Sequence, residues 1–87
     1  MNRTDLLKNA LNITRDRGEN YGKPSENFQV IADMWSAYAD KEFTVADVGV
    51  MMVLLKLARL KATPDHQDSW VDIAGYAAVT SEAVNAE

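Results

Sequence analysis

The segment from Val45 to Leu60 limits the possible folds most strongly, because apolar residues occupy most positions around it when it is read as a helix. A helix that is apolar on nearly every side is normally buried on more than one side. The chain has only 87 residues with which to cover it, and no cysteine for a disulfide. We therefore expect a helical bundle that self-associates as a homo-oligomer, with this helix near the interface.

Apolar spacing predicts two helices before this segment. The first starts near Thr4 and is expected to end by Gly18, since glycine is a common helix stop. Turn-forming residues follow, and Ser25 is expected to be the N-cap of the second helix. Asp40 and the lysine after it mark the end of that helix.

Two further helices complete the predicted fold. Thr44 is expected to cap the third helix, and Asp47 stands three residues later, as in a capping box with the shorter acid. Asp65 is a plausible N-cap for the fourth helix, which is expected to fray after Ser81. No strand pattern competes, so the sequence predicts one all-α domain over residues 1–87, a small four-helix bundle.

Composition narrows the function classes. The formal net charge is −4, which argues against binding to a DNA or RNA duplex, since such proteins normally present a basic face. No secretory signal is recognisable, and the longest apolar run, Val48 to Leu55, is too short to span a membrane. We expect a cytoplasmic protein with no membrane partner.

Lys56 and Arg59 are the first candidate binding residues. Three residues apart on a helix, they lie on one face and could hold a phosphate, Arg59 with bidentate donors. The alternative is that they neutralise the helix C-terminus and pair with Asp68 or Asp72 across the next turn. Both interpretations stay open, although Lys56 lies among leucines rather than in the final turn.

Asp68 and Asp72 are the candidate metal ligands. Carboxylates four residues apart can hold Mg²⁺ through oxygen, often with several waters retained. Alternatively, they are acids favoured near a helix N-terminus, which explains Asp68 better than Asp72. Two carboxylates suffice only for a metal that arrives with substrate phosphates.

Tyr21 and Lys23 flank a glycine between the first two helices. They could stack on a base and contact a phosphate, and Asn27 and Phe28 extend the same neighbourhood. More commonly, such a tyrosine plugs the core while the glycine supplies a positive φ.

Aromatic residues at helical spacing favour an aromatic core. Trp35, Tyr38, Trp70 and Tyr76 all fit this interpretation. Trp70 and Tyr76 are also candidate ligand-binding residues, since they lie in the segment that carries the paired charges. No catalytic triad and no glycine-rich phosphate loop is recognisable.

Together, these motifs resemble a family of small, uncharacterised phage and prophage proteins, over residues 14 to 80. The resemblance implies a host-cell cytoplasmic setting and no particular activity. The residues that carry it are Tyr21-Gly22, Asn27-Phe28, Trp35-Ser36-Ala37-Tyr38, Asp47-Val48, Leu55-Lys56-Leu57-Ala58-Arg59 and Asp68-Ser69-Trp70-Val71-Asp72-Ile73-Ala74-Gly75-Tyr76.

A more distant resemblance links the charged segments to MazG-like and nucleotide-modification-associated all-α domains. Such domains are usually dimeric or tetrameric and act on nucleoside triphosphates with Mg²⁺. The resemblance would make Asp68 and Asp72 the acidic positions, and Lys56 and Arg59 the phosphate-side cations.

This chain departs from the pyrophosphohydrolase pattern in its acids. Those enzymes pair a Glu-x-x-Glu helix with a Glu-x-x-Asp helix, whereas residues 48–55 here contain no carboxylate. The second helix offers only Glu26 and Asp33, seven residues apart. Two-metal chemistry needs several carboxylates around closely spaced ions.

These observations predict a phage-type small-molecule binder. It would bind, and sequester, a nucleotide or a nucleotide-derived signal, with Tyr21 or Trp70 stacked on the base. One alternative is a minimal Mg²⁺-dependent nucleotide pyrophosphohydrolase. The other is a structural phage protein whose apolar third helix serves only as an oligomer interface.

Overall fold

The computed structural model describes residues 1–86 and contains four α-helices in that range. They are α1 (Arg3–Tyr21), α2 (Pro24–Ala39), α3 (Val45–Ala62) and α4 (Gln67–Asn85). The predicted all-α, four-helix bundle is confirmed. None of the four helices combines the length and hydropathy needed to cross a bilayer.

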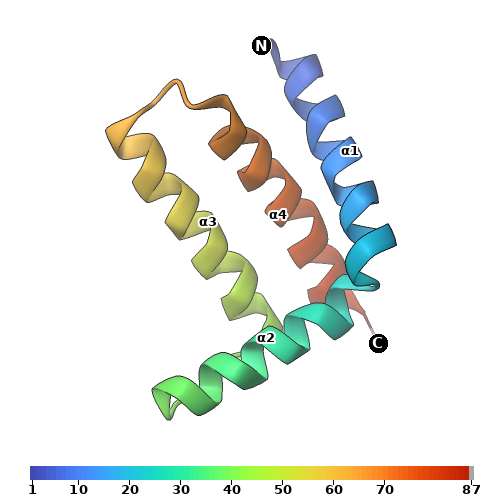
Figure 1. Cartoon of the computed structure of the whole chain (residues 1–87), viewed down its shortest axis with the longest axis vertical. Helices are drawn as coiled ribbons and strands as arrows, with labels where there is room; N and C mark the ends of the chain where they lie inside the picture. The colour runs from blue at the N-terminus through green and yellow to red at the C-terminus, as the bar shows by residue number, and fades with distance from the viewer. Residues whose placement is uncertain (87) are drawn as a thin grey trace.

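Helix α4 is the centre of the arrangement. It lies between α1 and α3, while α2 crosses near one end of the other three helices (Figure 1). α4 packs against each of the other helices, whereas the backbones of α1 and α3 stay apart. One side of α4, between α1 and α3, is therefore not covered by a contact between those two helices.

The core lies where α2 crosses α3 and α4. Trp35 and Tyr76 pack against it, and the Trp35 ring meets Phe43 edge to face at a centroid distance of 6.3 Å. The expected aromatic core is wrong for Tyr38, which is 95% exposed, and Trp70, which is 41% exposed, lies outside this core. The buried residues of this core are Phe28, Ala32, Val48, Val79 and Ala83.

The N-terminus of α3 is closed by the predicted capping box. The Thr44 hydroxyl accepts from the backbone N–H of Asp47 at 3.1 Å, and the Asp47 carboxylate accepts from the Thr44 N–H at 2.9 Å. The expected cap at Ser25 is wrong, because Pro24 already occupies the first helical turn and Lys23 takes the N-cap position. Proline's fixed φ suits that first position, so α2 begins earlier than expected.

Helix α4 also differs from expectation at both ends. His66 rather than Asp65 is its N-cap, since the His66 Nδ1 accepts from the Ser69 N–H at 3.2 Å and bonds the Ser69 hydroxyl at 2.7 Å. The helix continues past Ser81 to Asn85. Burial of Ala83 in the core gives this last turn a packing contact that its sequence alone does not reveal.

Helix α1 continues through Gly18 and ends at Tyr21. Its C-cap is Gly22, which has φ 77° and ψ −153° and donates its N–H to the Gly18 carbonyl at 3.2 Å. Glycine inside a helix costs only about 1 kcal/mol relative to alanine. A second glycine four residues later, in a conformation that other residues avoid, determines the actual end.

Gly49 allows α3 to pack closely against α4. A methyl group added at Gly49 would overlap the side chain of Thr80. The Thr80 hydroxyl is itself buried and has no hydrogen-bond partner among the described residues. The two helices therefore approach each other at this point only because residue 49 has no side chain.

We predict opposite effects for alanine at the two glycines near the end of α1. Gly18→Ala should raise the free energy of unfolding by about 0.5–1 kcal/mol, because it removes helix-interior glycine and the methyl meets nothing within 4 Å. Gly22→Ala meets nothing within 4 Å either, but its positive φ should cost about 1–3 kcal/mol. Urea unfolding followed by circular dichroism measures both. Equal destabilisation by the two variants would instead place the helix end at Gly18.

We predict that Gly49→Ala lowers the free energy of unfolding by about 1–3 kcal/mol through overpacking. Combining it with Thr80→Gly, which removes all three overlapping atoms, should recover most of the overpacking loss, apart from a cost of about 1 kcal/mol for a glycine inside α4. The control is Gly75→Ala, whose added methyl would lie at an ordinary 3.8 Å from the Thr14 methyl. Thermal unfolding of the four variants measures the coupling, and strictly additive effects would contradict this account.

Candidate ligand-binding site

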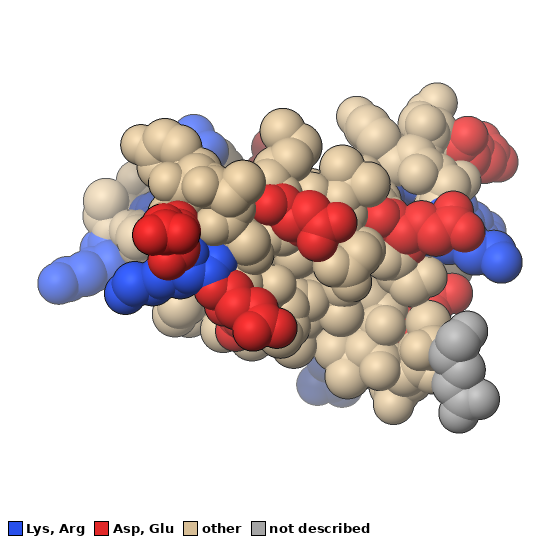
Figure 2. Space-filling model, turned by 90° about the horizontal axis from the view of Figure 1, so that it is seen from below, with Lys and Arg blue, Asp and Glu red and all other residues tan. Residues whose placement is uncertain are grey.

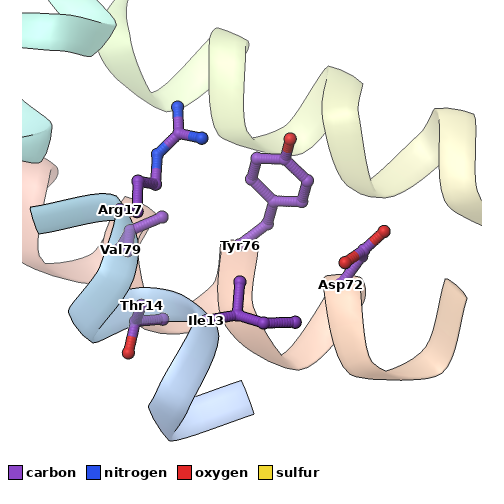
Figure 3. Close-up of a pocket in the computed structure, with 7 residues that line it drawn as sticks. Ile13, Thr14, Arg17, Asp72, Tyr76 and Val79 are labelled. Atoms are coloured by element: carbon purple, nitrogen blue, oxygen red, sulfur yellow. The ribbon is translucent and has the colours of Figure 1, made fainter. Parts of the chain in front are cut away.

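A cavity of about 170 Å³ lies between α1 and α4 (Figure 3). α1 and α3 each pack against α4, but their backbones stay apart. The cavity opens on the side of α4 that lies between them. In Figure 3 the Arg17 guanidinium, the Tyr76 hydroxyl and the Asp72 carboxylate all extend toward α3. The cavity is lined by Ile13, Thr14 and Arg17 of α1 and by Asp72, Gly75, Tyr76 and Val79 of α4.

Helical spacing brings these side chains together. Residues 72, 75, 76 and 79 are separated by three, one and three positions, which places them on one face of α4. Residues 13, 14 and 17 form the matching stripe of α1. Gly75 faces the Thr14 methyl, so the missing side chain leaves space between the two helices.

Arg17 is held by aromatic rings and an amide. Its Nη2 donates to the Asn27 side-chain oxygen at 2.9 Å. Its Cζ lies 5.2 Å from the ring centroid of Tyr21, 5.6 Å from that of Phe28 and 6.0 Å from that of Tyr76. Cations near ring faces at these distances are stabilised by the ring quadrupole, so the guanidinium is fixed in place without a carboxylate.

The charge of Arg17 is therefore not neutralised by another side chain. Within residues 1–86, the one ion pair joins Lys56 to Asp72. A guanidinium carries five N–H donors, and one of the Arg17 nitrogens bonds Asn27. The remaining donors can bind an anion.

Lys56 and Asp72 form an ion pair beside the cavity. The Lys56 Nζ lies 3.1 Å from the Asp72 Oδ2, and the two side chains are 19% and 29% exposed. This confirms, for Lys56 and Asp72, the alternative that a cation of α3 pairs with an acid across the turn. The Lys56 ammonium thus already has a carboxylate partner, and the phosphate clamp of Lys56 with Arg59 stays a prediction.

Three predicted site residues lie elsewhere. Arg59, Asp68 and Trp70 are exposed near the turn between α3 and α4 and do not line the cavity. The Trp70 Nε1 donates to the Pro64 carbonyl at 2.9 Å, which fixes the indole against that turn. The structure therefore separates this group from Asp72 and Tyr76.

Tyr21 and Lys23 lie at the junction of α1 and α2. The Tyr21 ring lies against Arg17 and is 63% exposed, so it does not plug the core. The expected positive φ is found at Gly22. Lys23 lines a separate hollow of about 440 Å³ together with Pro24 and Glu82.

The candidate metal ligands Asp68 and Asp72 do not form part of a larger acidic set. Among residues 1–86, no group of three or more His, Cys, Asp or Glu side chains could hold a metal ion. Asp72 already faces Lys56. A magnesium ion at these residues would have to obtain most of its ligands from a bound phosphate and water.

Arg17 is the cavity-lining cation that sequence reasoning missed. Arg17 and Tyr21 are four residues apart and share a face only if the helix continues past Gly18. Ending the helix at Gly18 placed Tyr21 in a loop and hid this pairing. The useful signal was Gly22, a second glycine better placed to end the helix.

Fold and cavity together define a small all-α protein with a cavity between α1 and α4 that is lined by one arginine, one aspartate, one tyrosine and smaller side chains. The chain belongs to the family described as Domain of unknown function (DUF6378), whose profile matches residues 5–84. The predicted membership of a small phage protein family is confirmed by this match and by the phage relatives below.

Two phage proteins are similar to most of this chain. The Gene 55 protein of Mycobacterium phage D29 is 50% identical over 65 residues, covering 75% of this chain and 43% of the relative. The Gene 55 protein of Mycobacterium phage L5 is 52% identical over 68 residues, covering 77% of this chain and 44% of the relative. The chain thus spans less than half the length of these relatives. No solved structure is a significant match.

We predict a coupling free energy of about 0.5–1 kcal/mol between Lys56 and Asp72. A double-mutant cycle with Lys56→Ala and Asp72→Ala measures it from urea unfolding, and added salt should reduce it. The control cycle uses Arg59→Ala and Asp68→Ala, for which we expect no coupling. A larger coupling in the control cycle would favour the other pairing that the sequence allowed.

Proposed function

We propose that this protein binds a nucleotide or a nucleotide-derived small molecule, and that Arg17 contacts its phosphate. The observation that carries the proposal is the Arg17 guanidinium, which lines the cavity and is held by Asn27 and three aromatic rings rather than by a carboxylate. Guanidinium donors match phosphate oxygens in geometry and charge.

The local charge supports an anionic ligand despite the acidic chain. The whole chain has a formal charge of −4. Around the cavity, however, Arg17 and Lys56 contribute two positive charges and Asp72 one negative charge, which leaves one positive charge in excess. An oriented cation in a partly dehydrated site interacts with phosphate more strongly than it would in bulk water.

The size of the cavity suggests how such a ligand would lie. Sites that enclose a whole drug-sized ligand usually measure about 300–1,000 Å³, and this cavity measures about 170 Å³. It would enclose the phosphate end, while the base lies outside against the exposed Tyr21 ring. Stacking on an aromatic ring is compatible with any base.

Asp72 and Tyr76 supply the polar contacts for the sugar in this proposal. A carboxylate accepts hydrogen bonds from hydroxyl groups, so Asp72 would accept from a ribose hydroxyl while it keeps Lys56 as a partner. A magnesium ion carried by the phosphates could approach the same carboxylate. Arg59, Asp68 and Trp70 are not used, because they lie outside the cavity.

The arrangement of the acidic residues favours a protein that binds its ligand without hydrolysing it. The carboxylates of residues 1–86 form no cluster of three that could hold a metal, and two-metal hydrolysis needs more than that. The relatives are phage proteins, and in an infected host cell such a binder would sequester a nucleotide signal. The alternative is a minimal pyrophosphohydrolase, and the assay for pyrophosphate release described below distinguishes it from a binding protein.

We predict that nucleotides raise the melting temperature of the protein and that the matching nucleosides do not. At a ligand concentration 100 times Kd, binding stabilises the folded state by about 2.7 kcal/mol. A thermal-shift screen of linear and cyclic nucleotides, with and without Mg²⁺, identifies the ligand and its affinity.

Arg17→Met tests the phosphate contact, because it keeps an apolar stem against the rings and removes the charge. It should weaken nucleotide binding by about tenfold, or 1.4 kcal/mol. Arg3→Met is the control, since Arg3 is an exposed cation of the same helix. Equal shifts with nucleosides, or an unchanged affinity in Arg17→Met, would overturn the phosphate assignment. Release of pyrophosphate in the presence of Mg²⁺ would show instead that the protein is a nucleotide pyrophosphohydrolase.

A further inference from the structure

Helix α3 has an exposed apolar face outside its close contact with α4 at Gly49. We call it the α3 face, and none of its residues lines the cavity described above. Leu54 at its centre is 56% exposed, whereas Gly49 on the other side of the helix packs against α4. The α3 face consists of Val50, Met51, Leu54, Leu55 and Leu57, each at least 40% exposed, and Ala58, which is also exposed.

The charged residues of α3 are arranged around this face rather than on it. Lys56 points to Asp72 of α4. Arg59 lies about 140° around the helix from Leu54, at 100° per residue. Asp47 and Lys61 are both exposed and lie seven residues before and after Leu54. Seven residues make nearly two full turns, so this acid and this base lie at the two ends of the α3 face.

We propose that the α3 face binds the α3 face of a second copy of this chain, with the two helices antiparallel and the two-fold axis at Leu54. In this arrangement Asp47 of each copy lies opposite Lys61 of the other, so the symmetric dimer contains the complementary contact twice. At the shallow crossing of about 20° that is common in bundles, helix ends seven residues from the axis stay close enough for such contacts. A parallel pair would place like charges together.

Charge also favours a second copy on this face over contacts elsewhere. Each chain carries a net charge of −4, so two copies repel each other in most orientations. Seen from the α2 side, acidic side chains spread across the surface and basic ones lie mainly near its two ends (Figure 2). The α3 face has no charge in its centre and one of each sign at its ends, which makes it self-complementary.

The apolar surface continues from the α3 face onto α4. A hollow of about 380 Å³, lined mainly by apolar atoms, lies between the two helices beside Val50, Leu54 and Val84. Side chains from a facing α3 can pack into such a hollow. Burying this surface removes apolar area from water, which is the main driving force of association.

The first experiment measures the mass of the protein in solution by sedimentation equilibrium. The wild type should have twice the 9.7 kDa of one chain. Leu54→Glu should give a monomer with unchanged helical circular dichroism. Leu7→Glu is the control, since Leu7 is a similarly exposed leucine of α1, and it should remain a dimer. A monomeric wild type, or a dimer that survives Leu54→Glu, would overturn the proposal.

A second experiment tests the orientation. The chain contains no cysteine, so a disulfide can form only between cysteines that are introduced for the experiment. Residues 50 and 58 are equally far from residue 54, so a mixture of Val50→Cys and Ala58→Cys chains should form the mixed disulfide. Val50→Cys alone should not cross-link. Cross-linking of Val50→Cys alone as fast as the mixture would show a parallel pair and overturn the orientation.

The end contacts give an independent measurement. Lys61→Glu places a carboxylate opposite Asp47 of the other copy and should weaken the dimer by about tenfold at low salt. The effect should shrink as salt increases. An unchanged dimer affinity would overturn the antiparallel register. All three experiments are done without nucleotide, so their outcome is separate from the test of ligand binding.

Discussion

The close packing of α3 against α4 at Gly49 is the contact on which the rest of the structure depends. It lets α4 serve as the shared surface for the other three helices. On the opposite flank, Gly75 lies on the side of α4 that faces Thr14. Gly49 thus lets α3 approach α4 closely, whereas the contact of α1 at Gly75 has ordinary spacing, and α2 closes one end (Figure 1). A chain of 87 residues obtains a core this way without α1 and α3 having to meet.

The gap between α1 and α3 explains why polar side chains gather on one side of α4. In a closed bundle that side would be covered by apolar contacts, and a half-buried arginine there would need a counter-charge. Here Arg17 reaches along the open side and is held by ring faces and the Asn27 amide. The cavity is therefore a consequence of the helix arrangement, and its charge follows from which residues α1 and α4 place on that side.

Local signals in the sequence predicted local structure well. The Thr44–Asp47 capping box depends on residues three positions apart, so it could be recognised without knowing the fold. The Lys56–Asp72 pair was one of two open alternatives, since helix periodicity does not fix how far one helix is shifted along another. Arg17 was missed because the helix was predicted to end at Gly18. With that end, Tyr21 would lie in a loop and not on the same helix face as Arg17. Interactions that depend on several helices together, such as the three rings around Arg17, have no short-range signal.

The contact at Gly49 and the cavity are linked through the geometry of α3. Lys56 is seven residues from Gly49, nearly two full turns along the same face of the helix. The distance between α3 and α4 at Gly49 therefore also sets whether the Lys56 ammonium reaches Asp72, now 3.1 Å away. Tyr76 lines both the ligand cavity and the apolar hollow beside the α3 face. A displacement of α3 would move both at once, so helix packing, ion pair and cavity shape form one connected structure.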